Sequence, residues 1–187
     1  MHIKDISGII LCGGKSKRYG SDKGLAFYHG KQLIQHAIEK LIPLCDEILI
    51  SSNNNNYHHF GYPCIADDIK QAGPASGILS AMKKAKHENC LVLACDMPDV
   101  PSELFSFLLE EKKDSDIVVP VHDGLIEPLA ALYLKSLSSK LEPILNKGIF
   151  KMTTILSHFK TCYCEVSSQE FYHKNIFRNI NYMEDID

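Results

Sequence analysis

The sequence predicts an α/β fold in which a mostly parallel sheet lies between two layers of helices. Two observations predict it. Short apolar runs of strand length alternate with longer segments of helical period, and the apolar runs are nearly continuous, as in strands covered on both faces. Strands and helices that alternate in this way form βαβ units with right-handed crossovers. At about 150 residues per domain, the 187 residues predict one domain over residues 1–187.

The first half of the chain supplies most of the alternation. An apolar run at 6–12 predicts the first strand, and apolar residues at helical spacing between Leu33 and Ile42 predict the helix that follows. Pro43 helps to end this helix. The next expected elements are a strand at 47–51, a short strand at 64–66, a helix over 75–85 and a strand at 90–95.

A further helix is expected to begin at Pro101, because proline is favoured in the first turn of a helix. A strand follows at 116–121, and after it the alternation becomes less regular. The remaining expected elements are a strand at 129–134, helices at 136–145 and 152–159, and a short strand at 162–166. No internal repeat and no Gly/Ser linker divides the sequence.

The charge balance argues against two classes of partner. Twenty basic residues against twenty-three acidic ones give a net charge of −3, whereas nucleic-acid binders usually have a basic excess. No apolar run approaches the roughly 18 residues that span a bilayer. The first apolar stretch, which ends at Cys12, is too short for the core of a signal peptide. We therefore expect a cytoplasmic protein that binds neither nucleic acid nor membrane.

The cysteines and histidines do not form a metal-binding pattern. The seven cysteines are odd in number and lack the two-residue gap of zinc or redox pairs. Most of them lie in apolar runs, where cysteine acts as a small buried hydrophobe. We expect reduced thiols in a reducing compartment and no dedicated zinc site.

Polar residues that directly follow strands are the first candidates for a site, because ligands of open α/β sheets bind outside the carboxyl ends of the strands. Four such positions occur: Gly13 onward, Asn53 onward, Asp67 with Asp68, and Asp96 onward. We expect all four to converge at one edge of the sheet.

The stretch 11–24 has the composition of a phosphate-binding loop, with four glycines and four cations. Glycines allow the backbone amides to form an anion-binding concavity. Arg18 would add a fork-shaped cation and Lys23 a point charge. This chemistry suits a triphosphate, although neither the Walker pattern GxxxxGK[ST] nor the dinucleotide pattern GxGxxG is present. The alternative is an exposed, solvated basic turn.

Five motifs, in order along the chain, carry a resemblance to a known family. The pattern LxGGxxxRxGxDKG at 11–24 resembles the nucleotide-binding signature of the molybdenum cofactor guanylyltransferases, which belong to the nucleoside-triphosphate nucleotidyltransferases. The later motifs are GPASG at 73–77, CDMP at 95–98, EPL with ALY at 127–133, and FRNIN with ED at 177–185. The resemblance covers residues 8–185. It implies a three-layer sandwich with a Rossmann-like sheet, one or two antiparallel strands, and the nucleotide-diphospho-sugar transferase type.

The resemblance also implies the activity. A member of this family transfers GMP from GTP to molybdenum-bound molybdopterin in a Mg²⁺-dependent reaction that releases pyrophosphate. Transient contact with molybdoenzymes or their chaperones is expected from the family alone. Two alternatives remain open: a CTP-dependent transferase acting on molybdopterin or another phosphorylated acceptor, and a non-catalytic nucleotide-binding adaptor.

Site residues carry over position by position. The resemblance implies nucleotide contacts at Leu11, Cys12, Gly13, Lys23, Asn53, Asp67 and Asp96. Catalysis is expected from Arg18, Lys23 and Asp96, with Asp96 as the Mg²⁺ ligand, because Mg²⁺ with phosphate ligands needs only one or two carboxylates. Asn179 and Asn181 are expected to close the site over the pterin or the metal.

Several of these assignments leave alternatives. Asp96 could instead cap the helix that begins near Pro101, although Asp99 or Ser102 would do so more naturally. Asn53 begins a run of four asparagines that could form only a polar turn, and Asp68 could replace Asp67.

Gly13 bears on the choice of base. The resemblance implies a guanine nucleotide here, since the family's guanylyltransferases carry LxGG where related cytidylyltransferases tend to carry LxAG, and the missing methyl group would make room for a purine.

Overall fold

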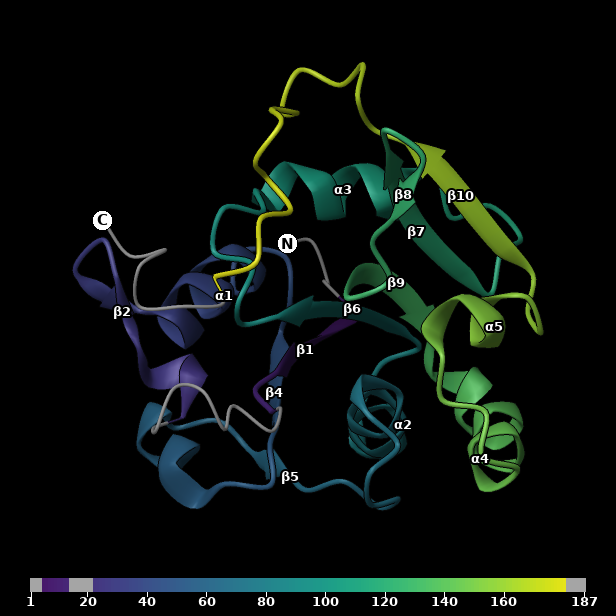
Figure 1. Ribbon diagram of the computed structural model, residues 1–187, viewed down its shortest axis with the longest axis horizontal. Coiled ribbons are helices and arrows are strands. Elements are labelled where there is room, and N and C mark those ends of the chain that lie inside the picture. The colour runs from purple at the N-terminus through teal and green to yellow at the C-terminus, as the bar shows by residue number, and fades with distance from the viewer. Residues whose placement is uncertain (1–4, 14–21, 181–187) are drawn as a thin grey trace.

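One eight-stranded sheet organises the protein (Figure 1). The structure is a computed structural model that describes residues 5–13 and 22–180. The strand order is β10-β7-β9-β6-β1-β4-β5, and β8 pairs with β7. The strands of this sheet are β1 (Ile6–Leu11), β4 (Glu47–Ser51), β5 (Cys64–Ile65), β6 (Asn89–Ala94), β7 (Ile117–His122), β8 (Leu125–Ile126), β9 (Ala130–Leu134) and β10 (Thr161–Glu165).

Most strands run in one direction. The central strand β1 pairs in parallel with β4 and β6, and β4 pairs in parallel with β5. Strand β9 is antiparallel to both β6 and β7, so β7 and its parallel neighbour β10 run in the same direction as β1. Among the described strands of this sheet, β9 and β8 alone oppose this direction. The prediction of a mostly parallel sheet with one or two antiparallel strands is confirmed.

Helices cover both faces of the sheet, and neighbouring residues of β1 face opposite layers. Ile10 packs with α1 (Leu33–Leu41) and α3 (Ser102–Glu110). Ile9 packs with the other layer, which consists of α2 (Pro74–Lys84), α4 (Ser138–Asn146) and α5 (Met152–Leu156). Figure 1 shows these two layers on opposite sides of the sheet. Within the described ranges, no helix has both the length and the apolar character needed to cross a membrane.

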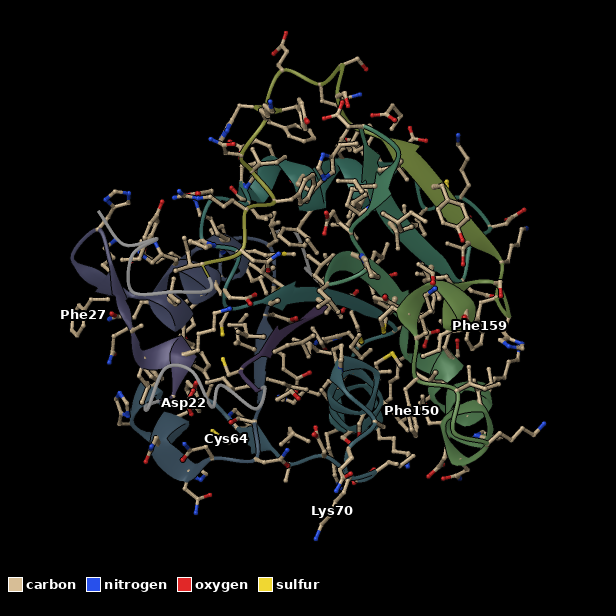
Figure 2. The ribbon with its side chains drawn as sticks, in the orientation of Figure 1. Asp22, Phe27, Cys64, Lys70, Phe150 and Phe159 are labelled. Carbon is tan, nitrogen blue, oxygen red and sulfur yellow. The ribbon has the colours of Figure 1, made fainter. Side chains whose placement is uncertain are left out.

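The structure adds short elements that the sequence did not predict. They are the 3₁₀ helices η1 (Lys23–Leu25), η2 (Asn55–Phe60) and η3 (Lys135–Leu137), the strand β8, and a separate hairpin of β2 (Phe27–Tyr28) and β3 (Lys31–Gln32). His29 and Gly30 turn this hairpin with φ of 46° and 79°, as two-residue hairpin turns require. A strand of two residues is too short to show the alternation of apolar and polar residues that predicts a strand from sequence. Figure 2 shows Phe27 projecting outward from the hairpin.

The last predicted helix also ends early. Helix α5 stops at Leu156, whereas the periodic pattern predicted that it would continue to residue 159. The amide nitrogens of His158 and Phe159 donate to the carbonyls of Ile155 and Leu156 at 3.0 and 3.2 Å. These hydrogen bonds span three residues, so the helix tightens into turns before β10 begins.

Candidate active site

The carboxyl ends of β1, β4 and β6 lie side by side. Leu11 is in register with Ser51 on one side and with Ala94 on the other. Two hydrogen bonds continue the pairing beyond the strands: the Cys12 amide donates to the Ser51 carbonyl at 2.8 Å, and the Cys95 amide donates to the Leu11 carbonyl at 3.1 Å. The loops that begin at Cys12, Ser52 and Cys95 therefore leave the sheet together, as the sequence predicted.

An ion pair joins two of the predicted catalytic residues at this edge. Lys23 Nζ lies 2.6 Å from Asp96 Oδ2, across 73 residues of sequence. The Lys23 side chain is 16% exposed and that of Asp96 is 24% exposed. A charge-assisted hydrogen bond that is largely shielded from water is stronger than one on the surface. The structure thus brings the glycine-rich segment and the end of β6 together.

Asp96 is not the cap of the following helix. The N-cap position of α3 is Pro101, which makes no side-chain capping bond. Asp99 accepts a hydrogen bond from the Tyr28 hydroxyl at 3.2 Å, and the Ser102 hydroxyl donates to Glu103. The capping alternative for Asp96 is therefore wrong, and its carboxylate faces Lys23 instead.

Asp22 holds the Lys23 turn against the loop that follows β4. Its Oδ1 accepts from the Gly24 amide at 3.4 Å and from the Tyr57 hydroxyl, while its Oδ2 accepts from Asn54 Nδ2 at 2.8 Å. Tyr57 is fully buried, and this burial, together with the neighbouring Cys12 and Cys95, raises the pKa of its phenol. The phenol therefore remains a hydrogen-bond donor.

Neither Asp22 nor Tyr57 was predicted as a site residue from the sequence. Asp22 was visible as the first residue of the DKG triplet, directly before Lys23. Tyr57 carried no signal, because it lies 35 residues from its partner in a polar segment without a motif.

Asn53 and Asp67 form a reciprocal pair. Asn53 Nδ2 donates to Asp67 Oδ2 at 2.8 Å, and the Asp67 amide donates back to Asn53 Oδ1 at 2.9 Å. Asp68 instead accepts from Lys83 Nζ at 3.1 Å, and its amide donates to Ser80 Oγ. The structure therefore places Asp67 beside Asn53 and ties Asp68 to α2.

Helix α2 approaches the same edge closely at Gly77. A Cβ at this position would collide with Ser51 Oγ and lie 3.4 Å from Asp67 Oδ1. Only glycine lets the first turns of α2 pack this near to the ends of β1 and β4. The motif at 73–77 therefore has a packing function in addition to its place in the resemblance.

The first three predicted nucleotide contacts differ in exposure. Leu11 and Cys12 are buried, whereas Gly13 is exposed and no described atom lies within 4 Å of where its Cβ would be. Burial and the adjacent Cys95 thiol raise the pKa of Cys12 well above the ordinary thiol value, so its side chain stays neutral. Contact of Leu11 and Cys12 with a ligand would therefore involve mainly their backbone.

The end of the described chain also reaches the site. The Ile180 amide donates to the Asp96 carbonyl at 2.9 Å, and the neighbouring Asn179 is exposed. Strand β9 begins nearby, since the Ala94 amide donates to the Leu129 carbonyl at 2.8 Å. Arg18 and Asn181, which the sequence analysis also predicted as site residues, lie outside the described residues.

The arrangement can bind a polyanion together with a divalent cation. Within the described ranges, no cluster of three or more His, Cys, Asp or Glu side chains forms a ready-made metal site. Asp96 supplies one carboxylate, and a phosphate-bound Mg²⁺ requires only one or two protein carboxylates beside phosphate oxygens and water. The donor set therefore fits a Mg²⁺ ion that binds together with a nucleotide.

Comparisons with known proteins point in the same direction. The MobA-like NTP transferase domain family matches residues 8–160 of the chain. The molybdenum cofactor guanylyltransferase of Shewanella putrefaciens is 33% identical over 186 residues, covering 96% of this chain and 93% of its own. A probable molybdenum cofactor guanylyltransferase of Carboxydothermus hydrogenoformans is 35% identical over 135 residues, covering 72% of this chain and 68% of its own.

A solved structure extends the likeness to the fold. The chain is similar to molybdopterin-guanine dinucleotide biosynthesis protein A from Archaeoglobus fulgidus, with a TM-score of 0.80 and 30% sequence identity. The match covers 96% of this chain and 94% of that one. The predicted fold type is therefore confirmed over nearly the whole chain.

Proposed function

The chain belongs to the MobA-like NTP transferase family and is a nucleotidyltransferase, and from this premise we propose that it transfers GMP from GTP to molybdenum-bound molybdopterin. The products are the guanine dinucleotide form of the cofactor and pyrophosphate. We propose that residues 1–187 act as one nucleotidyltransferase domain. The observation that carries the proposal is the Lys23–Asp96 pair at the carboxyl edge of the sheet, which joins the segment of the nucleotide signature to the carboxylate proposed to bind the metal.

The nucleotide is held mainly by backbone and amide groups in this proposal. The loop that starts at Gly13 offers amide donors to the phosphates, and Asn53 with Asp67 reads polar groups of the ribose or base. No atom of the described residues lies within 4 Å of the Gly13 Cβ position, and this supports a purine, because a methyl group would take up part of that space. Arg18 adds its fork-shaped cation to the phosphates.

Asp96 is the proposed ligand of Mg²⁺. A bound ion would offset the negative charge of the phosphates. Lys23 holds the carboxylate in place through Oδ2 and presents a cation to the same phosphates. The hydrogen bonds that Asp22 accepts from the Gly24 amide and from Asn54 hold the turn that carries Lys23 at the edge of the sheet.

The transfer is an in-line displacement at phosphorus. An oxygen of the acceptor's phosphate attacks the α-phosphorus of GTP, and the bond from that phosphorus to the oxygen bridging to the β-phosphate breaks. Pyrophosphate leaves with the electron pair, and Lys23 and Arg18 stabilise its charge. The attacking phosphate is already anionic, so no general base is required. The protein contributes positioning and charge stabilisation, as in other phosphoryl transfers.

Nucleotide choice is tested first. We expect GTP with Mg²⁺ to raise the melting temperature of the protein, with smaller shifts for CTP and ATP. A larger shift with CTP would favour the cytidylyltransferase alternative.

Catalysis is tested by pyrophosphate release in the presence of molybdenum-molybdopterin. Asp96→Ala is expected to abolish release while the protein remains folded, with Asp96→Asn as the isosteric control.

Lys23→Ala is expected to lose roughly 3 kcal/mol of transition-state stabilisation, the scale of removing one preorganised electrostatic group. Nucleotide binding by the wild type without any pyrophosphate release would indicate an adaptor instead of an enzyme.

A further inference from the structure

Arginine is unusually rare in this chain. Lysine and arginine together number 20, yet arginine occurs only at positions 18 and 178. Lysine cannot replace arginine where paired donors are needed, because only the planar guanidinium presents them in a fixed fork. Arg18 belongs to the proposed nucleotide loop, whereas no role has been assigned to Arg178.

Arg178 is held by two partners from distant parts of the chain. Its Nη2 donates to the Tyr28 hydroxyl at 2.8 Å, and the same nitrogen lies 3.7 Å from Asp99 Oδ2. The guanidinium also lies 5.9 Å from the centre of the Tyr28 ring, within cation–π range. Burial and the Asp99 carboxylate raise the pKa of Tyr28 against the opposing effect of Arg178, so the phenol stays protonated and donates to Asp99.

The segment that carries Arg178 contacts the proposed metal ligand, Asp96. Asp99 lies three residues after Asp96 in the loop between β6 and α3, and the amide of Ile180, two residues after Arg178, donates to the Asp96 carbonyl at 2.9 Å. Figure 1 shows how this happens: the final described stretch, in yellow, runs from β10 past α3 towards α1. Lys23 meets Asp96 at its carboxylate, whereas the final stretch meets it at its backbone.

The guanidinium is fixed and still accessible. The Arg178 side chain is 44% exposed, compared with 16% for Lys23. Guanidinium carries five N–H donors, and the two partners engage it through Nη2. A cation whose position is already fixed loses little conformational entropy when it binds a ligand.

We propose that Arg178 is a further substrate-binding residue, which binds the phosphate of the acceptor and positions it for attack. This inference rests on the proposed function, in which a phosphate monoester must approach the α-phosphorus near Asp96. A dianionic phosphate matches the arginine fork with two parallel hydrogen bonds. In this proposal Lys23 and the loop after β1 bind the nucleotide, whereas Arg178 binds the acceptor, so each substrate is bound by a different cation.

The test compares the Michaelis constants of the two substrates. In Arg178→Ala, we expect KM for molybdenum-molybdopterin to rise about tenfold or more, which corresponds to about 1.4 kcal/mol. The affinity for GTP with Mg²⁺, measured by fluorescence titration, should remain within about twofold, the scatter of such titrations. Arg178→Lys keeps the charge but loses the fork, and it should lie between the wild type and Arg178→Ala.

Two control variants separate binding from structural support. Tyr28→Phe removes the hydroxyl that fixes Arg178 but keeps the guanidinium, and it should raise KM for the acceptor less than Arg178→Ala does. Lys174→Ala removes an exposed cation from the same stretch and should behave as the wild type. Thermal unfolding of each variant shows whether the fold is retained.

Three results would overturn the inference. They are an unchanged KM for the acceptor in both Arg178 variants, an equal rise in Tyr28→Phe, and a loss of GTP affinity instead of acceptor affinity. If the wild type transfers nothing, the proposed function fails, and equilibrium dialysis of molybdenum-molybdopterin decides the inference separately. Retention by the wild type and loss in Arg178→Ala would support it, whereas equal retention or no binding by the wild type would overturn it.

Discussion

Gly24 lies where the turn that carries Lys23 passes closest to the buried interior. A Cβ at this position would collide with the Tyr57 hydroxyl and lie 3.2 Å from Cys95 Sγ. Both neighbours belong to segments that support the site, since Tyr57 donates to Asp22 and Cys95 precedes Asp96. The spacing of the Lys23–Asp96 pair therefore depends on the absence of one side chain.

Gly24→Ala is expected to lower the free energy of unfolding by about 1–3 kcal/mol, because added atoms in a packed region force the neighbours apart. Urea unfolding measures the change. Adding Tyr57→Phe removes the oxygen that the new methyl group meets, so the double variant should lose less stability than the two single losses added together.

Gly30→Ala is the matched control. Gly30 has a positive φ of 79°, but no described atom lies within 4 Å of where its Cβ would be. The free energy of unfolding lost on Gly30→Ala should be the same whether or not Tyr57→Phe is also present. Strict additivity of Gly24→Ala and Tyr57→Phe would contradict the close-packing explanation.

Cys90 is a fully buried thiol whose ionisation is opposed by its surroundings. Burial raises the pKa of this thiol to about 12, and the Glu88 and Glu47 carboxylates act in the same direction. The unfolded chain releases the proton near the ordinary thiol pKa of about 8.5–9, whereas the folded chain retains it. The folded form therefore loses stability relative to the unfolded form as the pH rises from about 9 towards 12.

Replacing Cys90 by alanine should flatten the decline of stability with pH. One group that titrates differently in the two states contributes up to about 1.4 kcal/mol per pH unit. Urea unfolding of the wild type and Cys90→Ala at pH 7, 9 and 10 measures the slope. Equal slopes above pH 9 would show that the thiol ionises freely in the folded protein.

The final described stretch, residues 166–180, runs from the edge strand β10 to the site. Its Phe177 ring stacks on His122 at the end of β7, with ring centres 4.6 Å apart and planes tilted by 25°. His122 in turn contacts Glu127 at 3.1 Å, and its ring is buried. The beginning of the 127–133 motif thus supports the segment that carries Arg178.

Phe177→Ala is expected to destabilise the protein by about 3 kcal/mol or more, since it leaves a cavity in the core. It should also release the stretch locally, so the Ile180 amide that donates to Asp96 should exchange with deuterium faster than the amides of β1. Hydrogen exchange followed by NMR measures both effects. Tyr172→Phe, which removes the long hydrogen bonds of 3.4 Å to His122 and Asp123, should leave the Ile180 amide protected.

Across the whole molecule, the sheet separates two cores. Ile34 of α1 belongs to the core on one face and Ile78 of α2 to the core on the other, and both are fully or almost fully buried. The sheet lies between them, and the two side chains belong to different clusters of buried residues. Substitutions in the two cores should therefore act independently.

Ile34→Val and Ile78→Val should each cost about 0.5–1.5 kcal/mol, and the double variant should lose the sum to within about 0.5 kcal/mol. Denaturant unfolding of the four proteins tests this. A coupling energy well above that margin would mean that the sheet transmits strain from one layer to the other.

The regular elements and the edge at which the site lies follow from the amino-acid pattern. Nearly continuous apolar runs such as 6–11 have few alternatives to a buried strand, and residues at the carboxyl ends of parallel strands meet by topology alone. That Lys23, Asn53, Asp67 and Asp96 lie at this edge could therefore be predicted from the amino-acid pattern and its resemblance to a family, whereas their functional roles stay predictions. The choice between Asp67 and Asp68 could not, because adjacent residues of the same type differ only in their neighbours in space.

The contacts that hold these residues in place arise only when the chain folds. The Lys23–Asp96 pair, the Tyr57–Asp22 bond and the contacts of Arg178 with Tyr28 and Asp99 span 73, 35, 150 and 79 residues of sequence. The spacing of apolar residues along the chain does not predict these contacts, because each depends on the path of the chain between the partners. The two-residue strands of the β2–β3 hairpin were missed for a related reason: pairing and a turn with positive φ form them, and neither leaves an apolar pattern.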